Sequence, residues 1–281
     1  MTTLRRSTRI LVALTAAAAL SLTACSSDDS SSSAEDGELA TLTPGKLTIA
    51  TGDPSYSPWV EDDDPESGKG FEAAVAYAVA EELGFDKADV TWVRTTFDAA
   101  IAPGPKDFDF NLQQFSITDE RKKGVDFSSP YYTTVPALVS VKGNKGADAT
   151  DIAGVKDSLI GVATGTTTLK AVEDLVDPSQ DVKIFNSNED AVQALTSGQI
   201  DLLAVDLPTA FYLSSAELDD GVVVGQLDTT EGGDQFGLVL PKDSELTDAV
   251  TDAVDALRED GTLDQLAQEW LADAVDAPVL K

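Results

Sequence analysis

Three cations lie side by side in the segment QQFSITDERKKGVDFSSPYY. Arg121, Lys122 and Lys123 stand out because the chain has 19 basic and 50 acidic residues and a formal net charge of -31. A guanidinium can hold a carboxylate through two parallel hydrogen bonds, which an ammonium cannot do. Ser116 and Thr118 precede the cations and add hydroxyl groups. The segment therefore fits either a solvated helix face or a clamp for an anion.

Three further segments place polar side chains just after predicted strands. In GVATGTTTLK, Thr167 either caps a helix or helps the free N–H groups of that helix to bind an anion. Asp206 follows an apolar strand and either caps the next helix or faces a ligand cation. Asp53, Tyr56 and Trp59 lie in the loop TGDPSYSPW, where the aromatic rings either line a pocket or pack on the sheet. Ligands of open α/β sheets bind beyond the carboxyl ends of strands, so these segments together indicate one cleft.

The composition excludes several classes of function. The chain contains no histidine, which rules out Ser-His-Asp and Cys-His catalysis and histidine-ligated metals. Its single cysteine rules out a disulfide within the chain. We expect no metal, no cofactor and no catalytic residue. The excess of acidic residues also opposes binding to the phosphates of nucleic acids.

The beginning of the chain predicts a lipoprotein. A short arginine-containing start precedes the apolar run ILVALTAAAALSLTA, which is too short to cross a membrane comfortably. The run ends in LTAC and resembles a lipobox, in which Cys25 would be lipidated. The alternative is an ordinary secretory signal with a chance cysteine. We predict a signal peptide over residues 1–24 and a flexible, polar tether over residues 25–44. Removal of the signal would leave 16 basic residues and a charge of -34.

The rest of the chain alternates between strand and helix patterns, which is typical of an α/β fold. Apolar runs predict strands at 46–51, 90–95, 108–113, 133–143, 159–164, 182–185, 201–206, 221–226 and 236–242. Helical spacing and capping residues predict helices at 70–84, 97–103, 118–124, 165–176, 188–198, 207–218, 244–260 and 262–273. Asn188 is the predicted N-cap of the helix at 188–198.

Taken in order, these segments resemble the family 3 extracellular solute-binding proteins, the amino-acid receptors of ABC importers. The resemblance extends from Lys46 to Leu271, and its most specific part is SIT-x-x-R followed by DFS-x-PYY. It implies a two-lobed, periplasmic-binding-protein-like α/β fold of type II, with parallel-rich sheets flanked by helices. Two hinge strands, near 133–137 and 234–237, would join the lobes. Lobe 1 would comprise 45–133 plus 234–281, and lobe 2 would comprise 134–233.

The resemblance also implies a set of ligand-binding residues: Asp53, Tyr56, Phe97, Gln114, Ser116, Arg121, Thr167 and Asp206. Arg121 would hold the α-carboxylate of the ligand, with help from Ser116, the backbone near Gln114, and Thr167 of the other lobe. Asp206 would accept the α-ammonium group. The other three would face the ligand side chain, and the carboxylate of Asp53 hints at a cationic or amide side chain. Gln113 and Gln114 stand where many members have a Gly or Ser pair, and APGPKDFDF also departs from the family pattern.

The predicted function is a receptor that captures an amino acid, expected to be polar, and delivers it to an ABC transporter permease. We expect it to be a monomer on the extracytoplasmic face of the cell membrane, attached only by its N-terminal lipid. The alternative on the same scaffold is an enzyme similar to cyclohexadienyl or arogenate dehydratases. A third possibility is a ligand-sensing subunit that signals to a membrane partner.

Overall fold

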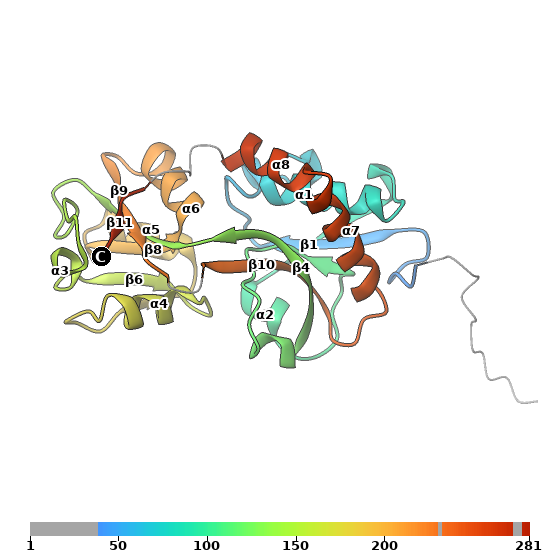
Figure 1. Cartoon of the computed structure of the whole chain (residues 1–281), viewed down its shortest axis with the longest axis horizontal. Helices are drawn as coiled ribbons and strands as arrows, with labels where there is room; N and C mark the ends of the chain where they lie inside the picture. Colours follow the sequence, from blue (N-terminus) through green and yellow to red (C-terminus); the bar gives the residue numbers. More distant parts are fainter. Residues whose placement is uncertain (1–38, 230–231, 272–276) are drawn as a thin grey trace, which may run out of the picture. The chain divides into compact units, whose positions relative to one another are not determined.

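The computed structural model describes residues 39–229, 232–271 and 277–281 (Figure 1). The predicted signal peptide, Cys25 and most of the predicted tether lie outside the described residues. Within these ranges, no helix combines the length and the apolar character needed to cross a membrane.

The first lobe is built on a five-stranded sheet. Its strands, in spatial order, are β2 (Val90–Thr95), β1 (Leu47–Gly52), β3 (Phe110–Asn111), β10 (Asp234–Pro241) and β4 (Val125–Thr134). β1 runs parallel to β2 and β3, whereas β10 runs antiparallel to β3 and β4.

Alternate residues of β1 pack on opposite faces of this sheet, as the two-residue period of a strand requires. Leu47 and Ile49 are fully buried in a cluster with residues of α1 (Phe71–Glu82), α7 (Thr247–Glu259) and α8 (Thr262–Leu271). Ala50 belongs to a separate cluster with Ala100 of α2 (Phe97–Ile101). Burying each Leu or Ile side chain stabilises the lobe by about 1.5–3 kcal/mol, so this packing fixes β1 against the helices.

The second lobe is built on a six-stranded sheet. Its strands, in spatial order, are β11 (Val279–Leu280), β9 (Gly221–Leu227), β5 (Pro136–Val141), β8 (Leu202–Asp206), β6 (Ile160–Ala163) and β7 (Lys183–Phe185). β5 runs antiparallel to β8 and β9, and the other neighbouring pairs are parallel.

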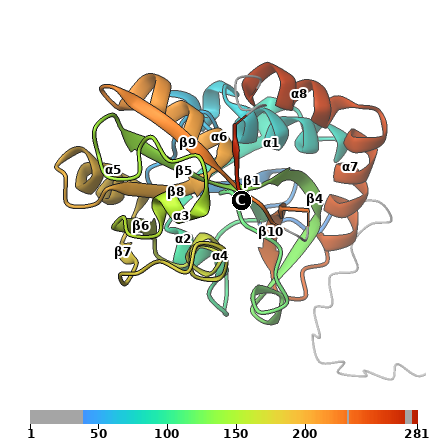
Figure 2. The same cartoon turned by 60° about the vertical axis from the view of Figure 1, so that its left-hand side comes forward.

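Helices cover both faces of the second sheet (Figure 2). Leu203 and Val205 of β8 pack with α5 (Asn188–Thr196) and α6 (Leu207–Tyr212), whereas Leu202 packs with α3 (Ile152–Val155) and α4 (Thr168–Leu175). This double burial explains why β8 reads as a continuous apolar run.

The chain passes between the lobes from β4 to β5 at Val135, and again between β9 and β10. The predicted fold of two α/β lobes is therefore confirmed. The placement of 234–281 in lobe 1 is wrong for its last residues, because β11 pairs with β9 in the sheet of lobe 2. A connection from α8 to β11 thus adds a third crossing to the two that were predicted.

Three local predictions also need correction. The predicted helix at 118–124 is only a 3-10 turn, Arg121–Lys123, because β4 begins immediately afterwards. The predicted strand at 133–143 is divided between β4 and β5. The N-cap of α5 is Ser187 and not Asn188, since the Ser187 side chain accepts a hydrogen bond from the backbone N–H of Asp190.

Candidate functional site

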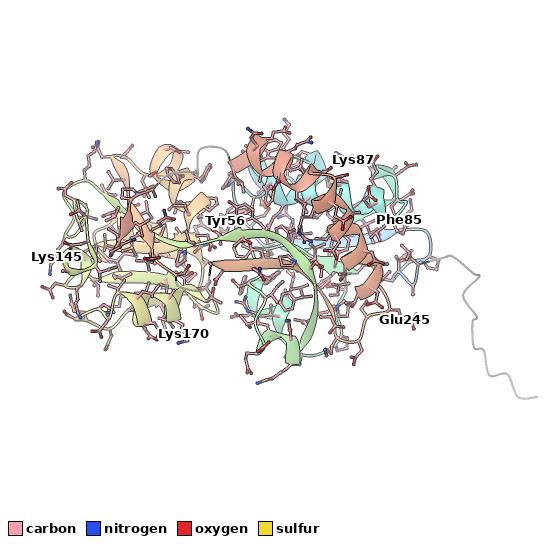
Figure 3. All side chains as sticks on the ribbon, in the orientation of Figure 1. Tyr56, Phe85, Lys87, Lys145, Lys170 and Glu245 are labelled. Atoms are coloured by element: carbon pink, nitrogen blue, oxygen red, sulfur yellow. The ribbon has the colours of Figure 1, made fainter. Side chains whose placement is uncertain are left out.

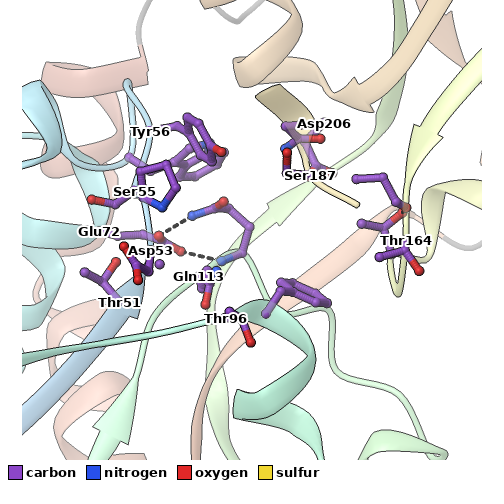
Figure 4. A pocket seen from close by; sticks show the side chains of 18 of the residues that line it. Thr51, Asp53, Ser55, Tyr56, Glu72, Thr96, Gln113, Thr164, Ser187 and Asp206 are labelled. Carbon is purple, nitrogen blue, oxygen red and sulfur yellow. Dashed lines mark hydrogen bonds between the residues drawn. The ribbon is translucent and has the colours of Figure 1, made fainter. Parts of the chain in front are cut away.

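All eight predicted ligand-binding residues line one cavity of about 170 Å³. Lobe 1 contributes the loop after β1, the start of α2 and the segment between β3 and the 3-10 turn; lobe 2 contributes the end of β8 and the start of α4. Figure 4 shows Asp53 and Tyr56 on the side of lobe 1, with Thr164 and Asp206 across from them. In Figure 3, Tyr56 lies between the lobes, whereas Lys145 and Lys170 lie on the periphery.

Arg121 is the cation that turns inward. One guanidinium nitrogen donates to the carbonyl oxygen of Ser116 at 2.7 Å, and the other donates to the carbonyl oxygen of Gly165, in lobe 2, at 2.9 Å. The guanidinium also lies 5.3 Å from the centre of the Phe97 ring. Lys122 and Lys123 are exposed to solvent. Arg121 forms no salt bridge among the described residues, so its charge remains available to an anion.

Thr167 contacts the other lobe and does not cap its own helix. It occupies the N-cap position of α4 without a side-chain capping bond. Its hydroxyl lies 3.1 Å from the Ser116 hydroxyl and donates to a carboxylate oxygen of Asp234. The same oxygen of Asp234 accepts from Ser116 at 3.1 Å. This cluster ties α4 to β10, and Asp234 is a site residue that the sequence did not predict.

Asp206 is likewise not a side-chain cap. It precedes α6 and makes no capping bond with its carboxylate, which instead faces the cavity. Burial and the negative charges of Asp234 and Glu72 raise the pKa of Asp206 to about 8, although Arg121 acts in the opposite direction. This carboxyl group is therefore largely protonated at neutral pH, and a cation beside it would favour its ionised form.

The match to known proteins agrees with this geometry. The family model of the bacterial extracellular solute-binding proteins, family 3, matches residues 47–273. The chain belongs to this family. The predicted family is thereby confirmed, and with it an extracellular solute-binding role.

Individual relatives of this solute-binding protein support the same assignment. The L-cystine-binding protein of Escherichia coli K12 is 33% identical over 221 residues, which is 77% of this chain and 79% of that protein. An ancestral arginine-binding protein bound to arginine has a TM-score of 0.66 and 31% identity, covering 80% of this chain and 98% of its own. An ancestral amino-acid-binding precursor of cyclohexadienyl dehydratase has a TM-score of 0.65 and 31% identity, covering 81% and 95%.

The aromatic loop after β1 of the solute-binding protein has two roles. Tyr56 and Trp59 both line the cavity, and Trp59, which is 1% exposed, also packs edge-on against the rings of Phe71 and Phe236. The indole N–H of Trp59 also donates to the hydroxyl of Thr209, in lobe 2, at 3.0 Å. A second cavity of about 320 Å³ adjoins the first, and the two share residues such as Tyr56 and Trp59.

Glu72 of the solute-binding protein is a buried acid in the wall of the first cavity, and the sequence analysis missed it. It is 1% exposed and accepts hydrogen bonds from the Tyr131 hydroxyl and from the backbone and side-chain N–H groups of Gln114. Burial raises its pKa to about 7, although these hydrogen bonds oppose the shift. The sequence did carry a signal, because Glu72 is an acid within the apolar segment GFEAAV. Its neighbours in the first turn of the helix, Phe71 and Ala73, are buried.

Arg94 is the third residue that the sequence analysis missed. Its guanidinium donates to the carbonyl oxygen of Gly52 at 2.8 Å and to the hydroxyl of Ser55 at 3.0 Å. It also forms a salt bridge with Asp63. These contacts fold the loop that presents Asp53 to the cavity, so Arg94 positions the site without lining it.

We expect Arg94→Ala to weaken ligand binding by about tenfold or more. Hydrogen bonds to charged groups stabilise by about 1.5–3 kcal/mol, and their loss should let the loop after β1 move. Calorimetric titration would measure the change. Arg258→Ala is the matched control, because Arg258 contacts Asp255 and Pro130 outside the cavity lining. Equal effects of the two substitutions would contradict a specific role for Arg94.

The described residues include no group of three or more Cys, Asp or Glu side chains arranged to hold a metal ion. The cavity offers hydrogen-bonding and charged groups to a ligand. Arg121 offers two N–H donors for a carboxylate, and Asp206 offers an acceptor for an ammonium group.

Proposed function

We propose that this protein captures a free amino acid between its lobes and delivers it to the permease subunits of an ABC transporter. The observation that carries this proposal is the presence of Arg121 and Asp206 on different lobes, both facing one cavity. The two groups match the opposite ends of a zwitterion. The cystine-binding and arginine-bound relatives support the proposal by their own ligands.

Capture follows from the contacts of Arg121. Its present acceptors, the carbonyl oxygens of Ser116 and Gly165, are neutral. Because hydrogen bonds to an ionised acceptor are stronger, a ligand carboxylate would replace at least one of them. Donors from both lobes would then hold the same ligand, so the ligand binds the closed arrangement more tightly and shifts the population toward it.

We expect a screen by thermal unfolding to identify the ligand. An amino acid present at about a hundred times its dissociation constant should add roughly 2.7 kcal/mol of stability. For a chain of this size, that corresponds to a rise of roughly 5–11 °C in melting temperature. The screen would compare the standard amino acids and cystine with simple amines and sugars. A response to a sugar, with none to any amino acid, would contradict the proposal.

A dehydratase remains the second candidate, because two carboxyl groups with raised pKa values, Glu72 and Asp206, line the cavity. Such groups can act as general acids. One of the similar structures is also a precursor of such an enzyme. Incubation with prephenate and arogenate separates the candidates, since a receptor leaves both unchanged. A role in sensing, by contrast, predicts capture of the same ligand with a different membrane partner.

We further propose that residues 1–24 are removed as a signal peptide and that Cys25 carries a lipid anchor on a monomeric receptor at the extracytoplasmic face of the membrane. A labelled fatty acid should enter the wild-type protein and not the Cys25→Ser variant. Equal labelling of the two proteins would contradict lipidation at this cysteine. Residues 39–44, which were predicted as part of the tether, belong to lobe 1, because Leu39 packs against its core and the backbone N–H of Leu42 bonds to Asp109. A protein that begins at residue 39 should therefore bind the ligand with unchanged affinity.

A further inference from the structure

Glu72 makes a set of contacts that amino-acid capture alone does not require. It accepts from the backbone N–H of Gln114 at 2.7 Å, from the side-chain amide of Gln114 and from the Tyr131 hydroxyl (dashed lines in Figure 4 mark bonds at Glu72). The side chain has no salt bridge within the described residues. A buried carboxyl group that contacts only neutral donors is costly, so its retention calls for a function.

The first effect of these bonds falls on the backbone of Gln114. Gln114 has a φ of 51°, in the left-handed region that residues with a Cβ rarely adopt. Such conformations persist where the surrounding structure holds them. Here Glu72 holds the N–H of the same residue, and this fixes the start of the segment that carries Ser116 into the cavity.

The second effect is on the orientation of the Gln114 amide. An ionised carboxylate can only accept hydrogen bonds, so the NH₂ of Gln114 must face Glu72. The amide oxygen then points away from Glu72, and no described residue donates a hydrogen bond to it. Gln114 lines both cavities, so this oxygen is available to a ligand as an acceptor.

Gln113 adds a second acceptor to the same wall. Its side-chain oxygen is buried and has no hydrogen-bond partner among the described residues. The side chain lines the first cavity together with the carboxylate of Asp53. A buried acceptor without a partner costs about 1–3 kcal/mol, and a ligand donor would remove that cost.

We propose that Glu72 is a positioning residue for ligand selection: it fixes Gln114 so that the cavity wall presents amide oxygens, and the protein therefore prefers amino acids whose side chains carry N–H donors over those whose side chains end in a carboxylate. This inference rests on the proposed capture of an amino acid. Charge favours the same class of ligand. The described lining of the cavity contains one cation, Arg121, and once Arg121 and Asp206 pair with the two ends of the ligand, the acids that remain are Asp53 and Glu72. Above the pKa of Glu72, about 7, a side-chain carboxylate would therefore meet unfavourable charge.

Glutamine and glutamate are the sharpest pair of probes, because they have nearly the same shape and differ in side-chain donors. Calorimetry at pH 8.5, where Glu72 and Asp206 are largely ionised, would use L-glutamine, L-arginine, L-lysine and L-glutamate. We expect at least one of the first three to bind the wild-type protein at least tenfold more tightly than glutamate. We also expect glutamine to bind more tightly than glutamate.

The role of Glu72 is tested by the ratio of the glutamine and glutamate affinities, which a purely structural role would not change. In Glu72→Gln, the new amide can donate to the oxygen of Gln114 and turn its NH₂ toward the cavity. The ratio should then shift toward glutamate by at least tenfold. Glu82→Gln is the matched control, since Glu82 lies exposed at the end of the same helix.

Gln114→Gly provides an independent test if Glu72→Gln does not fold. Glycine adopts positive φ readily, so the backbone should persist while the amide oxygen is lost. Selectivity should collapse in this variant, and adding Glu72→Gln should then change the ratio no further. Equal binding of glutamine and glutamate by the wild-type protein, or an unchanged ratio in both variants, would overturn this inference alone. A wild-type protein that binds no amino acid would instead overturn the proposed function.

Discussion

Arg121→Ala should weaken binding of the amino-acid ligand by about thirtyfold to several thousandfold. Removing one partner of a buried, hydrogen-bonded charge pair costs about 2–5 kcal/mol, and each 1.4 kcal/mol corresponds to a factor of ten. The loss should be large because Arg121 contacts both lobes through Ser116 and Gly165, so the substitution also removes a contact that closes the cleft. Calorimetry on the protein that begins at residue 39 would measure it.

Arg121→Lys should lose affinity as well, because a single ammonium cannot reproduce the planar fork of a guanidinium. Lys122→Ala and Lys123→Ala are the matched controls on the same 3-10 turn. Both side chains are exposed, and Lys123 pairs with Glu120 at the surface, so affinity should change little. If Lys122→Ala abolished binding while Arg121→Ala did not, the assignment of the carboxylate clamp to Arg121 would be wrong.

The affinity for the amino acid should rise with pH, by up to tenfold per pH unit between about pH 6 and pH 8. The pKa of Asp206 is about 8 before a ligand binds, so the group is mostly neutral below that value. A ligand ammonium favours the ionised form and lowers the pKa, so binding releases a proton. Raising the pH therefore strengthens binding until the pH exceeds about 8, the pKa of Asp206 before the ligand binds. Above that pH, the affinity should level off.

Calorimetry in buffers with different ionisation enthalpies would count the released proton directly. In Asp206→Asn the rise between pH 7 and pH 8 should disappear, and a deaminated analogue should show no rise with the wild-type protein. Glu72 faces the same cavity with a pKa of about 7, so a slope that persists in Asp206→Asn below pH 7 would report on Glu72. Tight, pH-independent binding of the deaminated analogue would leave Asp206 without the proposed role.

The fold was predictable where local patterns agree with tertiary packing. The apolar strand at 90–95 and the helix with Gly84 at its end have clear periodicity, and both occur as β2 and α1. β11 was not predictable, because two residues have no period and their pairing partner, β9, lies more than fifty positions earlier. The 118–124 segment was misjudged because its capping pattern is local, whereas the start of β4 at Val125 limits the helix to one turn.

Local patterns predicted some residues of the candidate site and not others. Strand ends and residue types placed Arg121, Thr167 and Asp206 in one cleft, as the structure also does. The residues that hold the loops around the cavity escaped notice because their partners are distant in sequence. Glu72 bonds to Gln114, 42 positions away, and Arg94 bonds to Gly52, also 42 positions away. No local pattern encodes such pairs.

The C-terminal strand has a practical consequence for optical measurement. The backbone N–H of Leu42 bonds to Asp109 in lobe 1, whereas Leu280 pairs with Leu227 in lobe 2. Residues near 42 and 281 therefore belong to different sides of the cleft. The only cysteine is Cys25, so a protein that starts at residue 39 offers no competing thiol. Dyes on cysteines introduced at these two positions would report ligand-driven movement of the lobes as a change in energy transfer, which would make the molecule a single-chain fluorescent sensor.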